Sequence, residues 1–259
     1  LIIPPLKLYD RGQPNETLLK MIERNVRIPH IVLGDIDAQI SCVRVGARRL
    51  LELVDTYGLD TVRTAFDALL QQAERMTRAC IAEIPDGTYR FHDYVDGDGL
   101  ENEQPIRIEA AVTITGSDVH FDFTGTAPQA RSAINSVPSS TMAIVYYTIR
   151  TITDPNIPNN HGCYRPISAT LPEGSIVNPK RPAAVSVRTV TIKRVVDVLL
   201  GCFAQVIPDR VHAASNGQLT SVKLGGIDPR TGRMYVVNAG IPTAGGMGAR
   251  PNKDGIDVI

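Results

Sequence analysis

The sequence lacks several features that would point directly to a partner. It contains no tryptophan, and its 27 Lys and Arg residues balance its 27 Asp and Glu residues. A chain without net charge has no electrostatic reason to bind nucleic acid or an anionic membrane surface. The longest strongly apolar window, residues 195–207, is interrupted by Asp197 and Gln205 and is shorter than the ~18 residues that cross a bilayer. We therefore expect neither nucleic acid nor a membrane as partner.

Cysteine is scarce as well. The four cysteines are far apart and form no C-x-x-C pair; they are Cys42, Cys80, Cys163 and Cys202. A disulfide framework or a cysteine-based zinc site would need a closer and more regular spacing. The cysteines therefore predict free, buried thiols and a cytoplasmic protein.

Three familiar catalytic signatures are also absent from the sequence. There is no G-x-S-x-G nucleophile elbow, no G-x-x-x-x-G-K-[ST] phosphate loop and no H-E-x-x-H zinc motif. Cys163 and His161 are close enough in sequence to form a nucleophile and a base, but no third residue is placed to orient the base. The residues alone therefore give no complete catalytic set and no metal ligands.

What the sequence does contain is the composition of a globular protein. Hydrophobic residues make up 43% and charged residues 21%, so a buried core is feasible. The 259 residues suit one large domain or two modest ones. The chain begins with Leu1 rather than methionine, and we expect it to be a segment of a longer or processed protein.

The first third of the chain has a helical pattern. Apolar residues at spacings of three and four predict helices over residues 16–26, 34–56 and 60–84, with Asn15 as the first cap and Pro29 ending the first helix. Gly58 and its neighbours form a short connection between the two long helices. We therefore expect a helical region over residues 1–86 that contains a long antiparallel helix hairpin.

After residue 86 the apolar period changes from 3.6 to 2. Alternation predicts an antiparallel meander over residues 88–95, 106–114 and 119–123. Further helices are expected at 139–152 and 190–206, and further strands at 166–171, 183–188, 218–225 and 233–238. The predicted class is α+β, with residues 87–259 as a mixed region that forms one body with the first.

Several loop residues have chemistry that suits a binding site. His161 lies in a loop held by proline and glycine, a setting that presents side chains on a rigid frame, although it also suits a turn histidine without function. Arg165 and Arg188 suit a carboxylate ligand or a structural ion pair. The backbone amides at Gly245 and Gly246 suit an anion, although glycine-rich turns are common.

Ordered sequence blocks resemble one known family. They are GDIDAQ at 34–39, RVGARRL at 44–50, PDGTY at 85–89, DFTGT at 122–126, DPNIPNN at 154–160, PEGS at 172–175, DVLLG at 197–201 and GGMGARP at 245–251. Each block is weak alone, but together and in this order they resemble the hydantoinase B/oxoprolinase family over nearly the whole chain. The family includes the B-type halves of ATP-dependent hydantoinases, the corresponding half of 5-oxoprolinase, and subunits of acetone and acetophenone carboxylases.

The resemblance implies a role in ATP-dependent opening of a cyclic amide such as a hydantoin or 5-oxoproline. In this family ATP is used by an A-type subunit, which phosphorylates the carbonyl oxygen, and the B-type half completes ring opening. A divalent metal held by His and Asp is expected in the full-length protein, with ligands outside this central segment. The segment alone is then expected to be inactive.

Within this picture no residue of the segment is assigned as catalytic or as a metal ligand. The expected substrate-binding residues, which position the substrate and stabilise anions, are Asn159, Asn160, His161, Arg165, Arg188, Gly245 and Gly246. Two alternatives stay open at this point: a ketone carboxylase subunit of the acetone carboxylase type, and a non-catalytic module that docks the A-type subunit.

Overall fold

The computed structural model describes residues 4–100, 104–215, 217, 220–243 and 246–256. Its contacts divide the chain into two compact units, of which one comprises residues 1–64 and 222–239 and the other residues 65–221 and 240–259. The change from helix to strand falls where the sequence places it, because α3 (Leu59–Ala82) is followed by β3 (Gly87–Val95). The α+β class is confirmed, and none of the described helices is both long and apolar enough to cross a membrane.

The first unit begins with a small hairpin and two helices. Strands β1 (Tyr9–Asp10) and β2 (Gln13–Pro14) pair antiparallel where the sequence indicates irregular chain. Helix α1 (Glu16–Asn25) is capped as predicted, since the Asn15 side chain accepts a hydrogen bond from the Leu18 amide at 3.2 Å. Helix α2 (Pro29–Tyr57) starts earlier than predicted: Pro29 begins it, because proline lacks an amide hydrogen that the first helical turn would leave unpaired.

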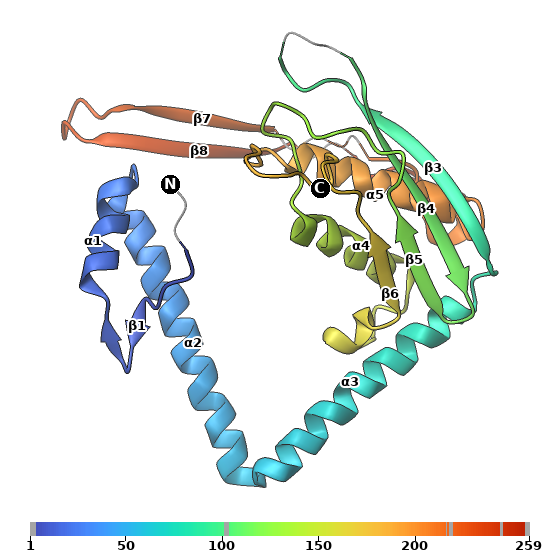
Figure 1. The fold of residues 1–259 in the computed structure, drawn as a ribbon, viewed down its shortest axis with the longest axis horizontal. Coiled ribbons are helices and arrows are strands. Elements are labelled where there is room, and N and C mark those ends of the chain that lie inside the picture. Colours follow the sequence, from blue (N-terminus) through green and yellow to red (C-terminus); the bar gives the residue numbers. More distant parts are fainter. Residues whose placement is uncertain (1–3, 101–103, 216, 218–219, 244–245, 257–259) are drawn as a thin grey trace. The chain divides into compact units, whose positions relative to one another are not determined.

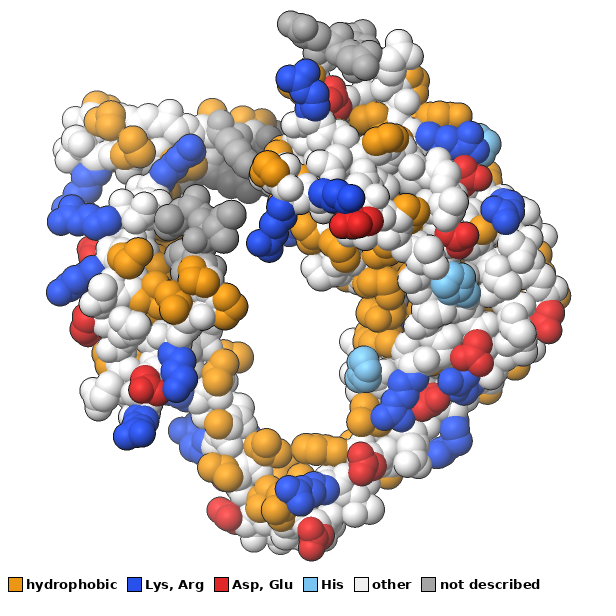
Figure 2. Space-filling model, viewed as in Figure 1, with side chains coloured by type: hydrophobic (Ala, Val, Ile, Leu, Met, Phe, Trp, Pro, Cys, Tyr) orange, Lys and Arg blue, Asp and Glu red, His pale blue; other side chains and the backbone are white. Residues whose placement is uncertain are grey.

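Helix α2 exposes its apolar side chains. No residue of α2 is buried, and Figure 2 shows hydrophobic side chains along it; the large exposed ones are Ile31, Val43, Val45, Leu50, Leu51, Leu53 and Tyr57. Gly58 ends the helix with a φ of 80°, a conformation that glycine adopts without strain. Both long helices are thus present, while their packing as an antiparallel hairpin stays a prediction because most of α3 belongs to the other unit.

The second unit is built on a four-stranded sheet (Figure 1). Its order is β3, β4 (Ile106–Thr115), β5 (Asp118–Asp122) and β6 (Ile167–Thr170). The first three strands form the predicted antiparallel meander, and β6 pairs parallel to β5. Strands β7 (Thr220–Ile227) and β8 (Met234–Thr243) form a separate two-stranded sheet near their predicted positions, and residues 222–239 of this hairpin belong to the first unit.

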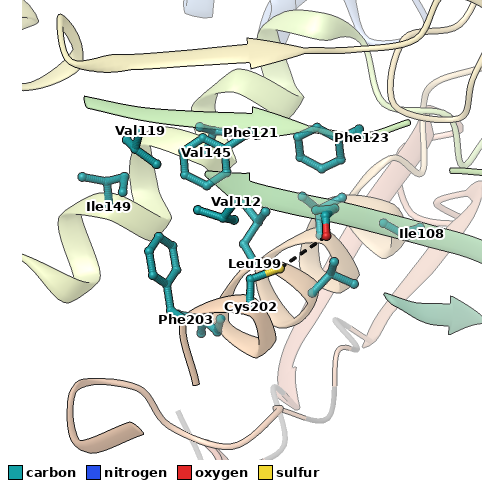
Figure 3. Packing of buried hydrophobic residues seen from close by; sticks show 14 of the residues in the cluster. Ile108, Val112, Val119, Phe121, Phe123, Val145, Ile149, Leu199, Cys202 and Phe203 are labelled. Atoms are coloured by element: carbon teal, nitrogen blue, oxygen red, sulfur yellow. Dashed lines mark hydrogen bonds between the residues drawn. The ribbon is translucent and has the colours of Figure 1, made fainter. Parts of the chain in front are cut away.

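Two helices bury one face of the sheet. Helix α5 (Thr189–Ala204) packs on β3 and β4, and α4 (Pro138–Ile152) packs beside α5. Figure 3 shows the resulting core, in which the rings of Phe121 and Phe203 lie 6.3 Å apart in an edge-to-face arrangement. Two short helices, η1 (His161–Tyr164) and η2 (Pro208–Arg210), follow α4 and α5 in the chain. Helix α5 therefore packs against both the sheet and α4.

The strand predicted at 183–188 is wrong. Residues 183–185 are irregular and 186–188 form a turn into α5. The backbone hydrogen bonds of this stretch go to loop partners instead of a ladder: the Val187 amide donates to Ala133, and the Asn135 side chain donates to the Ala184 carbonyl. The apolar alternation there reflects a loop packed against another loop.

The cysteines are free, but the prediction that all are buried is wrong for Cys42, which is exposed on α2. Burial raises the pKa of the Cys202 thiol to about 12, and its sulfur contacts the Ala110 carbonyl (Figure 3).

Because the thiolate is the reactive form, a thiol reagent at pH 8 should label Cys42 rapidly and Cys163 and Cys202 only after unfolding. Peptide mass mapping measures this, with Cys42→Ser as control. Labelling of Cys202 in the folded protein would contradict the packing of α5.

Candidate functional site

The loop that contains four predicted site residues is fastened to α3. The Asn160 side chain accepts a hydrogen bond from the Gly162 amide at 2.8 Å and donates to the Leu69 carbonyl at 3.2 Å. Gly162 packs so closely on α3 that a β-carbon at this position would overlap the Leu70 carbonyl oxygen. The loop therefore packs directly against the backbone of α3.

Two further candidates in the loop have structural partners. The Asn159 side chain accepts a hydrogen bond from the Tyr164 hydroxyl at 2.7 Å, and Arg165 forms an ion pair with Glu74 of α3 at 2.9 Å. His161 is exposed and its ring meets the Tyr164 ring edge-on. Asn159, Asn160 and Arg165 thus hold the loop in place, and their contact with substrate stays a prediction.

Glu74 of α3 pairs with Arg165 of this loop and with Arg78 of its own helix. The hydrogen bonds from Arg165 and then Arg78 lower the pKa of the Glu74 carboxyl. A carboxyl with a lowered folded pKa stabilises the fold above its unfolded pKa, and this stability is lost as pH falls through the folded pKa. Glu74→Gln should therefore lower the melting temperature at pH 7, with a difference from wild type that shrinks below the unfolded pKa.

The control for this prediction is Glu173→Gln. Glu173 pairs with Lys180 at 3.5 Å, with both side chains largely exposed, and exposed pairs of this kind add little stability. Melting temperatures from pH 3 to 8 measure both variants. An equal loss for Glu74→Gln at pH 3 and pH 7 would show that the ion pairs with Arg165 and Arg78 do not stabilise the junction.

The cysteine of the same loop is buried. Cys163 is fully buried, and its thiol donates to the Pro158 carbonyl at 3.1 Å. No hydrogen bond joins it to His161 among the described contacts. This geometry leaves the sulfur as part of a small apolar cluster with Ala73 and Ile157, so the structure gives no support to a Cys163–His161 nucleophile.

The remaining predicted site residues lie elsewhere. Arg188 is exposed at the start of α5, where its side chain does not cap the helix. Gly246 is half-buried, and Gly245 lies outside the described residues. Gly248 of the same motif packs closely, since a β-carbon there would overlap the Ala213 carbonyl oxygen. No described contact joins Arg188 or Gly246 to the Asn159–Arg165 loop, and a common site for these residues stays a prediction.

A cavity of about 550 Å³ lies between β3, α5 and the segment that follows η2. Its lining is formed by Arg90, Phe91, Asp93, Asp197, Leu200, Gly201, Ala204, Gln205, His212, Ala213 and Ala214. Phe91 covers Gly201 so closely that a β-carbon there would lie 2.5 Å from the ring. Glycine at 201 thus lets an aromatic ring form one wall of the cavity.

Two carboxylates share one guanidinium at this cavity. Arg194 of α5 lies 2.8 Å from Asp93 Oδ2 and 3.4 Å from Asp197 Oδ2. The Asp197 side chain is only 3% exposed, and it also accepts a hydrogen bond from the Ser215 amide at 3.3 Å. Burial raises the pKa of the Asp197 carboxyl, against the opposing effects of the Ser215 amide and Arg194. A buried carboxylate beside a cavity is a candidate functional group, because perturbed pKa values cluster at functional sites.

Asp197 is not among the site residues predicted from the sequence. It appears there as an interruption of the longest apolar window and as the first residue of the DVLLG block, without a role in a site. A lone carboxylate among the buried residues of a helix is itself a signal, because such a group is costly to bury unless it is paired or functional. Asp93 of β3 and His212 after η2 gave no comparable signal, since they lie near Asp197 only through tertiary packing.

The described residues do not provide a metal site. In the part of the chain that the structure describes, no three His, Cys, Asp or Glu side chains gather in a way that suits a metal ion. The resemblance implies a divalent metal in the full-length protein, but these residues do not fit one, and no step of the chemistry is assigned to a metal here.

Comparisons with known proteins show which family the chain matches. The family model described as hydantoinase B/oxoprolinase matches residues 1–259. The chain is 36% identical, over 98% of its length, to a Pseudomonas sp. (strain NS671) protein assigned as the B component of a D-/L-hydantoinase, and 33% identical over 98% to the beta chain of the Pseudomonas jessenii caprolactamase. It covers 44% of each of these relatives.

Solved structures agree with these matches. The crystal structure of the ATP-dependent caprolactamase from Pseudomonas jessenii aligns with 100% of this chain at 30% identity, with a TM-score of 0.90 and 45% of that chain covered. A nucleotide-free acetone carboxylase aligns with 96% of this chain and 35% of its own at a TM-score of 0.86, where 19% identity shows a shared fold only. The ordered motifs and the comparisons lead to the same result, and the chain belongs to the hydantoinase B/oxoprolinase family.

Proposed function

We propose that this chain is part of the B-type half of an ATP-dependent enzyme that opens a cyclic amide. The observation that carries the proposal is the match to an ATP-dependent caprolactamase over the whole chain, at 30% identity and a TM-score of 0.90. Since the chain spans less than half of its relatives, the rest of the protein is expected to complete the reaction centre.

The chemistry explains why ATP is needed. An amide is stabilised by resonance between nitrogen and carbonyl, which makes the carbonyl carbon a poor electrophile. Phosphorylation of the carbonyl oxygen removes this stabilisation and makes the carbon a better electrophile. Water then adds to this carbon, the C–N bond breaks to release the amine end of the chain, and a second water displaces phosphate from the resulting acyl phosphate. We propose that ATP is bound by an A-type subunit, which carries out this step, and that the B-type half opens the activated ring.

The proposal gives the chain the task of binding and orienting the ring. A divalent metal, if the full-length protein holds one, would polarise a carbonyl or activate water. Its ligands would come from other residues of the full-length protein, because no suitable cluster occurs among the described ones. The substrate-binding residues proposed from the sequence remain Asn159, Asn160, His161 and Arg165, with Arg188, Gly245 and Gly246 second.

Phosphate release by the full-length protein with its A-type companion tests the proposal. Hydantoin, ε-caprolactam, 5-oxoproline and the ketone acetone are each supplied with ATP, with and without bicarbonate. We expect ring-dependent phosphate release that does not need bicarbonate. A strict bicarbonate requirement with a ketone substrate would indicate a carboxylase, and normal complex assembly without any turnover would indicate a docking module.

A further inference from the structure

The buried carboxylate of Asp197 holds the segment that follows η2. Asp197 accepts a hydrogen bond from the Ser215 amide at 3.3 Å, and its side chain is only 3% exposed. The Ser215 hydroxyl accepts a further hydrogen bond from the Gly217 amide at 3.2 Å. A buried carboxylate is costly unless charged and polar groups satisfy it. The segment that supplies the Ser215 amide is therefore tied to α5.

Arg194 fixes the same carboxylate from its own helix. Its guanidinium lies 3.4 Å from Asp197 Oδ2 and 2.8 Å from Asp93 Oδ2 of β3, so it links α5 to the sheet. Gly217, which has a φ of 64°, packs against this guanidinium, because a β-carbon there would lie 3.1 Å from Arg194 Nη2. The chain on both sides of residue 216 thus contacts the Asp197–Arg194 pair.

The segment also contacts the glycine-rich motif, which we define as residues 246–251. The Ala213 amide donates to the Ala249 carbonyl at 2.9 Å, and a β-carbon on Gly248 would overlap the Ala213 carbonyl oxygen. The Met247 amide donates to the Ile256 carbonyl at 2.8 Å, which closes the motif into a loop. Because Ala213 lies two positions before the residue that binds Asp197, one short segment joins the carboxylate to the motif.

We propose that Asp197 is a positioning residue, which with Arg194 fixes residues 211–215 and through them holds the glycine-rich motif in place. This inference rests on the proposed function, in which Gly246 of the motif takes part in binding substrate. Asp197 acts through Ala213 and Ser215 without touching the substrate. Backbone groups bind a ligand more tightly when their conformation is fixed beforehand, so loss of this support should weaken substrate binding more than it slows the chemical step.

Hydrogen exchange of Asp197→Ala, in the full-length protein with its companion, measures the positional effect. We expect the amides of residues 211–215 and 246–251 to exchange at least about tenfold faster than in the wild type, with η1 unchanged. Asp197→Asn should show a smaller increase in both segments, because its amide oxygen still accepts from Ser215 while its charge toward Arg194 is lost. The matched control is Asp209→Ala, an exposed aspartate on η2.

Chemical rescue separates positioning from a general loss of folding. Asp197 lines the β3–α5 cavity of about 550 Å³, so its removal leaves room there for a formate ion between Arg194 and the Ser215 amide. Asp197→Ala should raise KM for the ring about tenfold with a smaller effect on kcat. Formate should restore slow exchange in both segments and lower KM again, whereas chloride at equal ionic strength or uncharged formamide should not.

Hydrogen exchange decides the positioning role even if the wild type opens no ring, an outcome that would reject the proposed function alone. Faster exchange at 211–215 with unchanged exchange at 246–251 would overturn the link to the motif. Turnover with unchanged KM in Asp197→Ala would overturn the effect on substrate binding while leaving the proposed function intact. Should Asp197→Ala not fold, wild-type exchange at 246–251 in Asp197→Asn would likewise overturn the inference.

Discussion

Replacing Gly162 by alanine is expected to destabilise the protein by about 3 kcal/mol or more. The β-carbon would overlap the carbonyl oxygen of Leu70, which belongs to the helical backbone of α3 and has no flexible side chain to move aside. The overlap can be relieved only by moving η1 away from α3. That movement would also lengthen the Asn160–Leu69 hydrogen bond and the Arg165–Glu74 ion pair.

Thermal and urea unfolding of Gly162→Ala measure this effect. Gly46→Ala is the matched control, since it lies inside α2 with nothing within 4 Å of the added β-carbon. Alanine favours a helix over glycine by about 1 kcal/mol, so this control should stabilise slightly. Equal stability of Gly162→Ala and wild type would mean that η1 does not pack on α3 as described.

Phe203→Ala is expected to cost about 3–5 kcal/mol. Phe203 is fully buried on α5, and its ring meets that of Phe121 on the central part of the sheet (Figure 3). Removal leaves a cavity among side chains that belong to α5 and β5 and cannot close without moving a helix. The loss should also loosen α5, which carries Asp197, Gly201 and Ala204.

The control for Phe203→Ala is Tyr147→Ala on α4. Tyr147 is 54% exposed, so its truncation should change the free energy of unfolding by much less. Urea denaturation of both variants gives the comparison. If both cost the same, the sheet–helix core is not centred on Phe121 and Phe203.

Periodicity was sufficient where one element buries one face. The meander of β3, β4 and β5 and the positions of α4 and α5 were predicted because alternating or helical apolar residues meet one core. The same criterion failed at residues 183–188, where an apolar alternation serves loop packing, and at Pro29, where proline starts α2 instead of ending α1. The pattern of apolar residues within one segment does not show which other segment packs against it.

The candidate site was less predictable for the same reason. Loop composition led to Asn159, Asn160 and Arg165, which the structure engages in fastening a loop to α3. The cavity depends on residues over a hundred positions apart, such as Asp93 and Asp197, which meet only through tertiary packing. Its one visible sign in the sequence was a single carboxylate within an apolar helix.

The coupling between ring opening and ATP tests the account most directly. The full-length protein and its A-type companion would be supplied with a saturating neutral lactam, and both ADP and opened ring would be counted. We predict equal amounts of the two products, and neither product when the companion or ATP is left out. Ring opening by this chain without nucleotide would contradict the account.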